Sequence, residues 1–147
     1  MRSDCCRVSL STSALFFSQV LLALAEALGS FTAHVGGSAF AFCLLQPLET
    51  LASVEETVVR EKAVEALCKV GEEFPVEQLN EHYIEMLKRL SGGDWFTSRV
   101  SSCGLFATAY AKVADGAVRQ QLITSFKQLC HDETPMVRRA AASCLGK

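Results

Sequence analysis

Hydrophobic and polar positions recur along this chain at helical spacing, and the same arrangement returns every 39 residues. Within each segment, apolar residues lie three or four positions apart, as on one face of an amphipathic helix. Across segments, apolar, small, acidic and basic residues each keep their own columns. The columns are Leu45, Ile84 and Ile123; Leu48, Leu87 and Phe126; Leu51, Leu90 and Leu129; Leu67, Phe106 and Leu145; Ala63, Ser102 and Ala141; Glu55, Asp94 and Glu133; and Arg60, Arg99 and Arg138. Agreement of four residue classes at one offset indicates a tandem repeat.

Capping and turn residues predict where the helices begin and end. Thr57 is a favourable N-cap, and Thr134 followed by Pro135 combines a cap with a proline in the first helical turn. Gly92 and Gly93 end another helix. The predicted helices cover residues 20–28, 40–52, 58–73, 76–90, a segment capped by Asp94 or Thr97 and running to about Val113, 117–130 and 135–147.

These elements predict an all-α fold, an α-solenoid of stacked antiparallel helix pairs. We expect a partial repeat at 20–38, full repeats at 39–75 and 76–115, and a truncated repeat at 116–147. Residues 1–19 do not share the pattern, and we expect them to be irregular or partly helical. Each pair has an apolar stripe that only a neighbouring pair can cover. The shared core is predicted to contain Leu48, Leu51, Leu67, Leu87, Leu90, Phe106, Phe126 and Leu129.

Composition narrows the function classes. The chain has 147 residues, half of them apolar, and a formal net charge of −2, which argues against nucleic-acid binding. The mean hydropathy of +0.24 suits a solenoid whose end repeats expose apolar faces. No apolar run reaches the roughly 20 residues of a membrane span, so we expect no membrane partner.

The seven cysteines form no C-x-x-C pair, and their number is odd. Five of them, Cys43, Cys68, Cys103, Cys130 and Cys144, lie in apolar helical stretches. There a thiol behaves as a small buried hydrophobic group. This interpretation favours a reducing compartment over a disulfide framework.

Catalytic chemistry has little support. His34, His82 and His131 share no short spacing with acids or thiols, and His131 beside Cys130 lacks the ligand spacing of a zinc site. There is no phosphate-binding glycine loop and no G-x-S-x-G motif. We therefore expect no catalytic residues, no metal and no cofactor.

Three stretches carry a more specific resemblance: LLQPLETLASVEETVVREKAVEAL from Leu44, KRLSGGDWFTSRVSSCGLF from Lys88 and DETPMVRRAAAS from Asp132. With VLLALAEALGSFTAHVGG from Val20, they closely resemble the N-terminal HEAT repeats of the scaffolding A subunit of protein phosphatase 2A. The resemblance covers residues 20–147. Residues 1–19 and the length of the chain depart from it.

The resemblance implies a non-catalytic scaffold that bridges phosphatase subunits in the cytoplasm, and also in the nucleus. In this family, regulatory subunits dock on the turns within N-terminal repeats, whereas the catalytic subunit binds C-terminal repeats that this chain lacks. We therefore expect a regulatory subunit to bind weakly and the catalytic subunit to show no binding. The implied contact residues are Glu55, Glu56, Thr57, Asp94, Trp95, Phe96, Glu133, Thr134, Pro135 and Met136.

Several of these residues also have a purely structural interpretation. Trp95, the only tryptophan, is either an exposed binding anchor or a plug between repeats. The arginine column of Arg60, Arg99 and Arg138 follows the acidic column by five positions, which predicts a ladder of charge pairs between repeats. Arg139 has no basic counterpart in the other repeats and is the arginine most available to a partner. The acidic column either stabilises helix N-termini or attracts a basic partner.

Other functions stay open at this stage. The chain could be an unrelated helical-repeat adaptor or a truncated product without independent function. Residues 14–25 resemble the apolar core of a signal peptide, so a secreted or membrane-associated protein is a further alternative. The remaining alternative is an enzyme, which an assay for hydrolase activity would check.

Overall fold

The computed structural model describes the backbone of residues 4–146 and the side chains of residues 15–146. In this part of the chain all regular structure is helical, which confirms the all-α prediction. The elements are α1 (Asp4–Leu28), the 3₁₀ helix η1 (Ser38–Phe40), α2 (Phe42–Leu51), α3 (Thr57–Glu73), α4 (Val76–Gln78), the π-helical η2 (Leu79–Ile84), α5 (Glu85–Ser91), α6 (Phe96–Cys103), α7 (Phe106–Lys112), α8 (Gly116–Cys130) and α9 (Pro135–Cys144).

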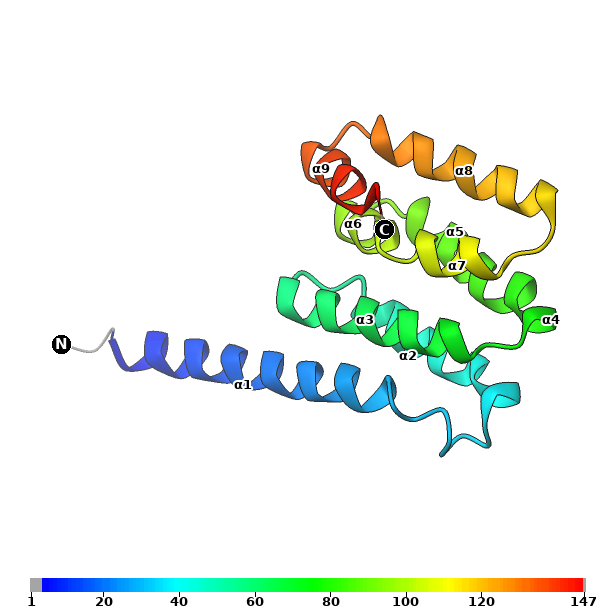
Figure 1. The fold of residues 1–147 in the computed structure, drawn as a ribbon. Helices are drawn as coiled ribbons and strands as arrows, with labels where there is room; N and C mark the ends of the chain where they lie inside the picture. Colours follow the sequence, from blue (N-terminus) through cyan, green and yellow to red (C-terminus); the bar gives the residue numbers. More distant parts are fainter. Residues whose placement is uncertain (1–3, 147) are drawn as a thin grey trace.

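The helices stack in pairs (Figure 1). Helix α2 packs on α3, the continuous run from α4 to α5 packs on α6 and α7, and α8 packs on α9. Helix α1 lies against α3 at one end of the stack, and α8 with α9 forms the other end. The connections between α2 and α3, α5 and α6, and α8 and α9 lie on one side of the stack (Figure 1). We call these three connections the corners.

The repeated columns form the core. Ala63, Ser102 and Ala141 are 0% exposed, so the small-residue column is fully buried. Of the predicted core residues, all are buried except Phe126, which is half-buried and packs edge-to-face on Phe106 with 5.3 Å between ring centroids. Burying one large apolar side chain stabilises a fold by roughly 1.5–3 kcal/mol, so the shared core holds the stack together.

The N-terminal helix is longer than predicted. Helix α1 runs from Asp4 across the proposed boundary at residue 19, so residues 4–19 are helical, one of the two forms expected for this segment; residues 1–3 lie outside the described part. No glycine or proline occurs between Asp4 and Leu28, so nothing interrupts the helix. It ends at Leu28 as predicted. A Cβ on the following Gly29 would lie 2.9 Å from the Cβ of Ala66, so glycine permits close packing on α3.

The predicted helix ending near Val113 is interrupted at Gly104. The single proton of the Ser101 hydroxyl is shared between the carbonyls of Ala52 in the preceding repeat (2.6 Å) and of Thr97 (3.0 Å). Gly104 and Leu105 then donate to carbonyls three residues earlier, a tighter turn than an α-helix. Serine side chains compete with backbone hydrogen bonds in this way. The interruption separates α6 from α7, and both contact α3.

Two expected caps also differ. Thr57 lies inside α3, and its hydroxyl accepts a hydrogen bond from Arg60 (3.2 Å) and does not cap the helix. Pro135 does occupy the start of α9, as predicted, but the Thr134 hydroxyl makes no cap hydrogen bond. The Thr134 N–H donates to the Asp132 carboxylate at 2.8 Å.

The five cysteines whose side chains are described are free thiols. Cys103 is buried, and Cys68, Cys130 and Cys144 are half-buried, in line with the expected apolar surroundings. Cys43 is exposed, so that prediction is wrong at this position, which lies on the outward side of α2. Within residues 4–146, no helix combines the length and apolar character that crossing a membrane requires.

Candidate partner-binding ridge

The three corners present the predicted contact residues together along one side of the stack (Figure 1). Glu55, Glu56 and Thr57 at the first corner are exposed, as are Asp94, Trp95 and Phe96 at the second. At the third corner, Glu133, Pro135 and Met136 are exposed and Thr134 is half-buried. We call these residues, with Val58, the corner ridge.

Each corner is held by the arginine of the helix that follows it. Nη1 of Arg99 donates to the carbonyls of Gly93 and Asp94, at 2.8 and 2.9 Å. Nη1 of Arg138 donates to Asp132 and Glu133 in the same way, at 2.7 and 2.9 Å. Arg60 makes the equivalent pair of bonds to the first corner, at 2.9 Å to Val54 and 2.5 Å to Glu55. The arginine column therefore fixes corner geometry in the same way three times.

The expected ladder of charge pairs is wrong in most of its steps. Each arginine binds the backbone carbonyl, not the carboxylate, of the acid five positions before it. Among residues 15–146, Arg60 and Arg138 make no ion pair. Only Arg99 reaches the next repeat, where it binds Asp132 through two hydrogen bonds of 2.8 and 3.2 Å. The positions equivalent to Asp132 in the earlier repeats are Gly93 and Val54, which offer no carboxylate.

The Arg99–Asp132 pair is largely shielded from solvent, with side-chain exposures of 12% and 10%. Hydrogen bonding to Asp132 raises the pKa of Arg99. Burial opposes ionisation of Asp132, but the hydrogen bonds from Arg99 and Thr134 outweigh it, so the pKa of Asp132 is below its ordinary value. The pair is thus charged on both sides at neutral pH and links the second and third corners.

The exposed acids of the ridge are free for other contacts. The N-cap residues of α3, α6 and α9 make no side-chain cap bond, and the carboxylates of Glu55 and Asp94 have no hydrogen-bond partner in the described region. Glu133 approaches Arg99 at only 3.9 Å and is 90% exposed. A helix-dipole role needs no such bond. The acids nevertheless form an open negative row along the corners.

Trp95 is 73% exposed and therefore does not plug the space between repeats. Phe96 beside it is 38% exposed, and Met136 is 58% exposed. Val58, which the sequence interpretation missed, is 60% exposed. The repeat spacing could have identified Val58, because Val58 lies two repeat lengths before Met136, which was predicted as a contact residue. The ridge thus alternates exposed apolar side chains with acids.

Each of the three histidines makes a local contact within the fold. His82 stacks on Phe42 with 4.9 Å between ring centroids, and His34 stacks on Phe31 at 4.8 Å, so both are ring contacts within the fold. Nδ1 of His131 lies 2.9 Å from the Lys127 carbonyl. In the described residues no three histidines, cysteines or acids are grouped so as to hold a metal ion.

Comparison with known proteins agrees with this arrangement. The HEAT repeat family model matches residues 122–147, which cover most of α8 and all of α9. The beta isoform of the 65 kDa regulatory A subunit of serine/threonine-protein phosphatase 2A from Homo sapiens is 57% identical over 129 residues, or 88% of this chain and 21% of the relative. The alpha isoform from Arabidopsis thaliana is 54% identical, and a probable PP2A regulatory subunit from Caenorhabditis elegans 56%, each covering 88% of this chain and 22% of the relative.

Over 88% of its length, the chain is similar to HEAT-repeat regulatory A subunits of protein phosphatase 2A. It spans about a fifth of the length of the curated relatives it matches, 21–22%. The matches favour this family over an unrelated helical-repeat adaptor. In this segment the arginine column holds the backbone of the corners, and other residues of the same corners are exposed.

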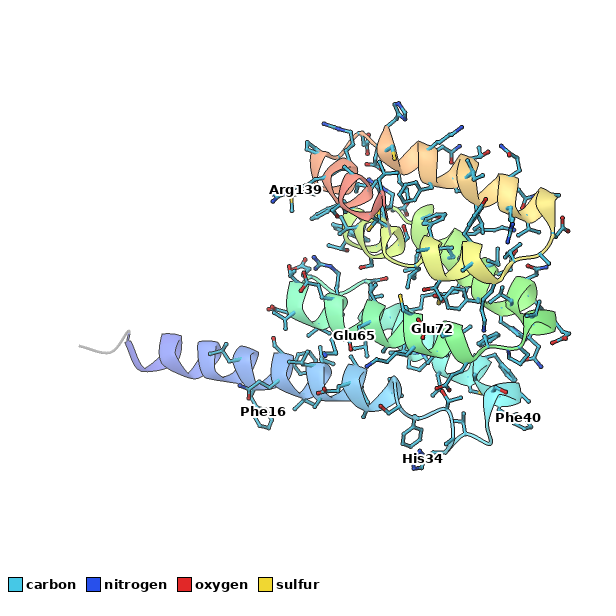
Figure 2. The ribbon with its side chains drawn as sticks, in the orientation of Figure 1. Phe16, His34, Phe40, Glu65, Glu72 and Arg139 are labelled. Atoms are coloured by element: carbon cyan, nitrogen blue, oxygen red, sulfur yellow. The ribbon has the colours of Figure 1, made fainter. Side chains whose placement is uncertain are left out.

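Arg139 projects outward from α9 beside the ridge (Figure 2), and it is exposed. The guanidinium of its neighbour Arg138 donates to the corner carbonyls of Asp132 and Glu133. Arg139 makes no hydrogen bond or ion pair with residues 15–146. It is therefore a cation at one end of an otherwise acidic ridge.

Proposed function

We propose that this chain is a non-catalytic scaffold segment whose corner ridge binds a phosphatase regulatory subunit. The exposed row of Trp95, Phe96, Val58 and Met136 on arginine-held corners is the observation that supports this function most strongly. Tryptophan is enriched among residues that dominate binding energy, and Trp95 lies near the middle of the row. The relatives are named regulatory A subunits, which is the reason for choosing a subunit of the phosphatase as the partner.

Charge indicates the character of the partner surface. Glu55, Glu56, Asp94 and Glu133 surround the apolar side chains with carboxylates, whereas Arg139 is the one ridge cation free of intramolecular bonds in the described region. Complementary potential speeds association and disfavours wrong partners more than it adds affinity. The partner surface should therefore combine apolar pockets with a mainly basic rim.

Hydrogen bonds hold the backbone of the corners in the absence of a partner. Arg60, Arg99 and Arg138 already hold the corner carbonyls, so a partner need not order this backbone when it docks. Ordering a flexible loop would cost free energy that reduces affinity. A row of pre-organised corners at a constant repeat spacing is a suitable docking edge for a scaffold.

The test is a pull-down of purified regulatory subunit with the full chain. We expect weak but saturable capture, and Trp95→Ala should lower affinity by about tenfold or more. Phe40→Ala is the matched control, because Phe40 is 53% exposed and lies away from the corners (Figure 2). Equal loss in both variants, or no capture at all, would contradict the proposal and favour a product without independent function.

The same assay with the phosphatase catalytic subunit should give no binding. Strong capture of that subunit by this chain alone would mean that the docking surfaces are assigned incorrectly.

We also place the chain in the cytoplasm, and in the nucleus as a second compartment. The five free thiols suit a reducing compartment, and N-terminal sequencing of the expressed protein checks it, since cleavage near Ala25 would indicate secretion.

A further inference from the structure

Helix α1 is apolar on two opposite sides. Toward α3 it places Ala25, which is buried, and Leu21, Leu22 and Leu28, which pack partly buried against the core. The opposite side, which we call the free face, consists of Phe16, Phe17, Val20, Ala23, Leu24 and Ala27, all exposed. The large side chains on it are exposed by 68% at Phe16, 64% at Phe17, 49% at Val20 and 45% at Leu24. An apolar side of a helix is normally covered by a neighbouring element, and here only one of the two sides is.

The other end of the stack shows how a solvent-facing helix of this chain is built. The outward side of α8 exposes polar residues: Gln120, Gln121, Thr124, Lys127 and Gln128. The free face of α1 has the opposite composition, which is the composition of a surface that packs against another element.

The arrangement of the other helix pairs indicates that the free face can accept an antiparallel helix. In the three stacked pairs, a first helix lies antiparallel to the second, as α2 lies beside α3 (Figure 1). Helix α1 packs on α3 in the position of a second helix, but no described element covers its free face. Figure 2 shows Phe16 pointing away from α3. The surface therefore fits one further helix.

Charge restricts what that helix can be. Between Val8 and Leu28 the only charged residue is Glu26, and its carboxylate lies 4.0 Å from Lys62 of α3. No basic side chain borders the free face between these residues, whereas helices that lie on membranes are usually rich in lysine and arginine. The occupant is thus an uncharged apolar helix, and α1 itself is such a helix.

We propose that the free face pairs with the free face of a second copy, with the two α1 helices antiparallel around a two-fold axis at Val20. Phe16, Val20 and Leu24 are four residues apart and so lie along one side of the helix. A two-fold axis at Val20 places Phe16 of one copy opposite Leu24 of the other and covers both free faces at once. Such an interface is self-complementary and closes at a dimer.

The size of the surface sets the expected strength. Covered aromatic side chains bury about 150–250 Å² each, so the free face would bury on the order of 500 Å² per copy. About 1,000 Å² in total is the lower end of specific interfaces. The dimer should therefore be weak and depend on concentration. Its surface is separate from the corner ridge, so Trp95→Ala should leave it unchanged.

Sedimentation velocity of the full chain over a range of concentrations tests the proposal. The mass should rise from 16.0 kDa toward twice that value as concentration increases. Val20→Glu and Val20→Lys should each raise the dissociation constant at least about tenfold, because like charges would meet at the axis. Val76→Glu is the matched control, since Val76 is 51% exposed and lies elsewhere, and it should still dimerise.

An equal mixture of Val20→Glu and Val20→Lys is the decisive sample. Opposite charges at the axis should restore a heterodimer only if Val20 of one copy meets Val20 of the other. Circular dichroism checks that each variant is folded, and Leu24→Glu repeats the test at a second position. Three results would overturn the proposal. The wild-type chain could stay monomeric, Val20→Glu and Leu24→Glu could both still dimerise, or the mixture of Val20→Glu and Val20→Lys could stay monomeric.

Two other occupants give distinct results that also overturn it. Species whose mass keeps growing with concentration would indicate head-to-tail association. In that case α1 of one copy would occupy an apolar hollow of about 640 Å³ at the opposite end of another copy. The hollow is lined in part by Phe106, Tyr110, Leu122 and Phe126. A monomer that floats with phosphatidylcholine vesicles would mean that the free face binds a lipid surface.

Discussion

The Arg99 guanidinium in α6 binds the carboxylate of Asp132, which lies just before α9, through hydrogen bonds of 2.8 and 3.2 Å. The same guanidinium holds the carbonyls of Gly93 and Asp94 at its own corner. The Arg99 side chain therefore holds the backbone of the second corner and also links that corner to the third. Arg60 and Arg138 perform only the first of these tasks in the described part of the chain.

Replacing Arg99 by alanine should lower the free energy of unfolding by about 2–3 kcal/mol, because it leaves a shielded carboxylate and two carbonyls without their donor. Arg138→Ala is the matched control. Arg138 makes the same corner bonds but is exposed and has no acid across from it, so its loss should be about 1 kcal/mol or less. Urea denaturation of both variants measures the difference, and equal losses would mean that the inter-repeat link adds nothing.

Acid should weaken the fold partly through Asp132. A carboxyl group whose pKa is lower in the folded than in the unfolded chain stabilises the fold above its unfolded pKa of about 3.9, and this contribution is lost as pH falls through the folded pKa. The free energy of unfolding should therefore drop below about pH 4, and less steeply in Asp132→Asn.

Glu65 provides the contrast in the same pH titration. Hydrogen bonds from Lys69 and Lys62 lower the pKa of Glu65 to about 2, but the group is on the surface. Molar salt should remove its part of the acid dependence and leave that of shielded Asp132 in place. Identical salt sensitivity of Asp132→Asn and Glu65→Gln would contradict the assigned difference in burial.

The Tyr83 hydroxyl is buried without a hydrogen-bond partner in the described structure, and its ring is 0% exposed. Burial raises the pKa of Tyr83 well above its ordinary value, so the group stays neutral. Tyr83→Phe removes a polar atom that nothing satisfies, and it should be neutral or stabilising by about 1 kcal/mol. Thermal unfolding measures this change, and a clear loss of stability would show that the hydroxyl is bonded in solution.

Gly71 faces the same ring from α3. A Cβ at this position would lie 2.8 Å from a Tyr83 ring carbon, a contact that forces the packed ring to move. Gly71→Ala should therefore destabilise the fold by about 1–3 kcal/mol, even though alanine is the better helix former. Thermal unfolding of Gly71→Ala, measured together with Tyr83→Phe, tests this prediction. If Gly71→Ala were more stable than the wild-type chain, the Tyr83 ring would have room to shift.

The described thiols should differ sharply in reactivity. Burial raises the pKa of Cys103 to about 12, so almost no thiolate is present at neutral pH. Cys43 is exposed and should react first with iodoacetamide. Peptide mapping by mass spectrometry should find Cys103 modified only under denaturing conditions. Early modification of Cys103 would mean that the end of the stack opens readily.

Trp95→Ala should separate binding from stability. Because Trp95 is 73% exposed, its removal should change the free energy of unfolding by no more than about 0.5 kcal/mol. The affinity for the regulatory subunit should fall in the same variant. Thermal unfolding beside the pull-down measures both, and a marked loss of stability would mean that the tryptophan packs between repeats in solution.

Several features followed from the sequence because they depend on residue type and spacing. A side chain that recurs at the repeat interval meets the same surroundings in each repeat, so Ala63, Ser102 and Ala141 could be assigned to one tightly packed layer. Pro135 was predicted at the start of α9 because its missing N–H is harmless there. The ridge residues were nominated by resemblance, and their exposure agrees with a surface role.

Other features required the stacked structure. The partner of Arg99 is Asp132, and no repeat column contains that acid, because the pairing depends on the distance between neighbouring corners. The division of the helix at Gly104 depends on the Ser101 hydroxyl reaching Ala52 in another repeat.

The sequence by itself determined the all-α class, the order of the repeats and the apolar columns, since the spacing of apolar residues decides which of them can share a helix face. Only the tertiary structure decided which polar groups meet across repeats, and which apolar face of α1 stays uncovered. Those outcomes depend on the separation and rotation of packed helices, which no single segment specifies.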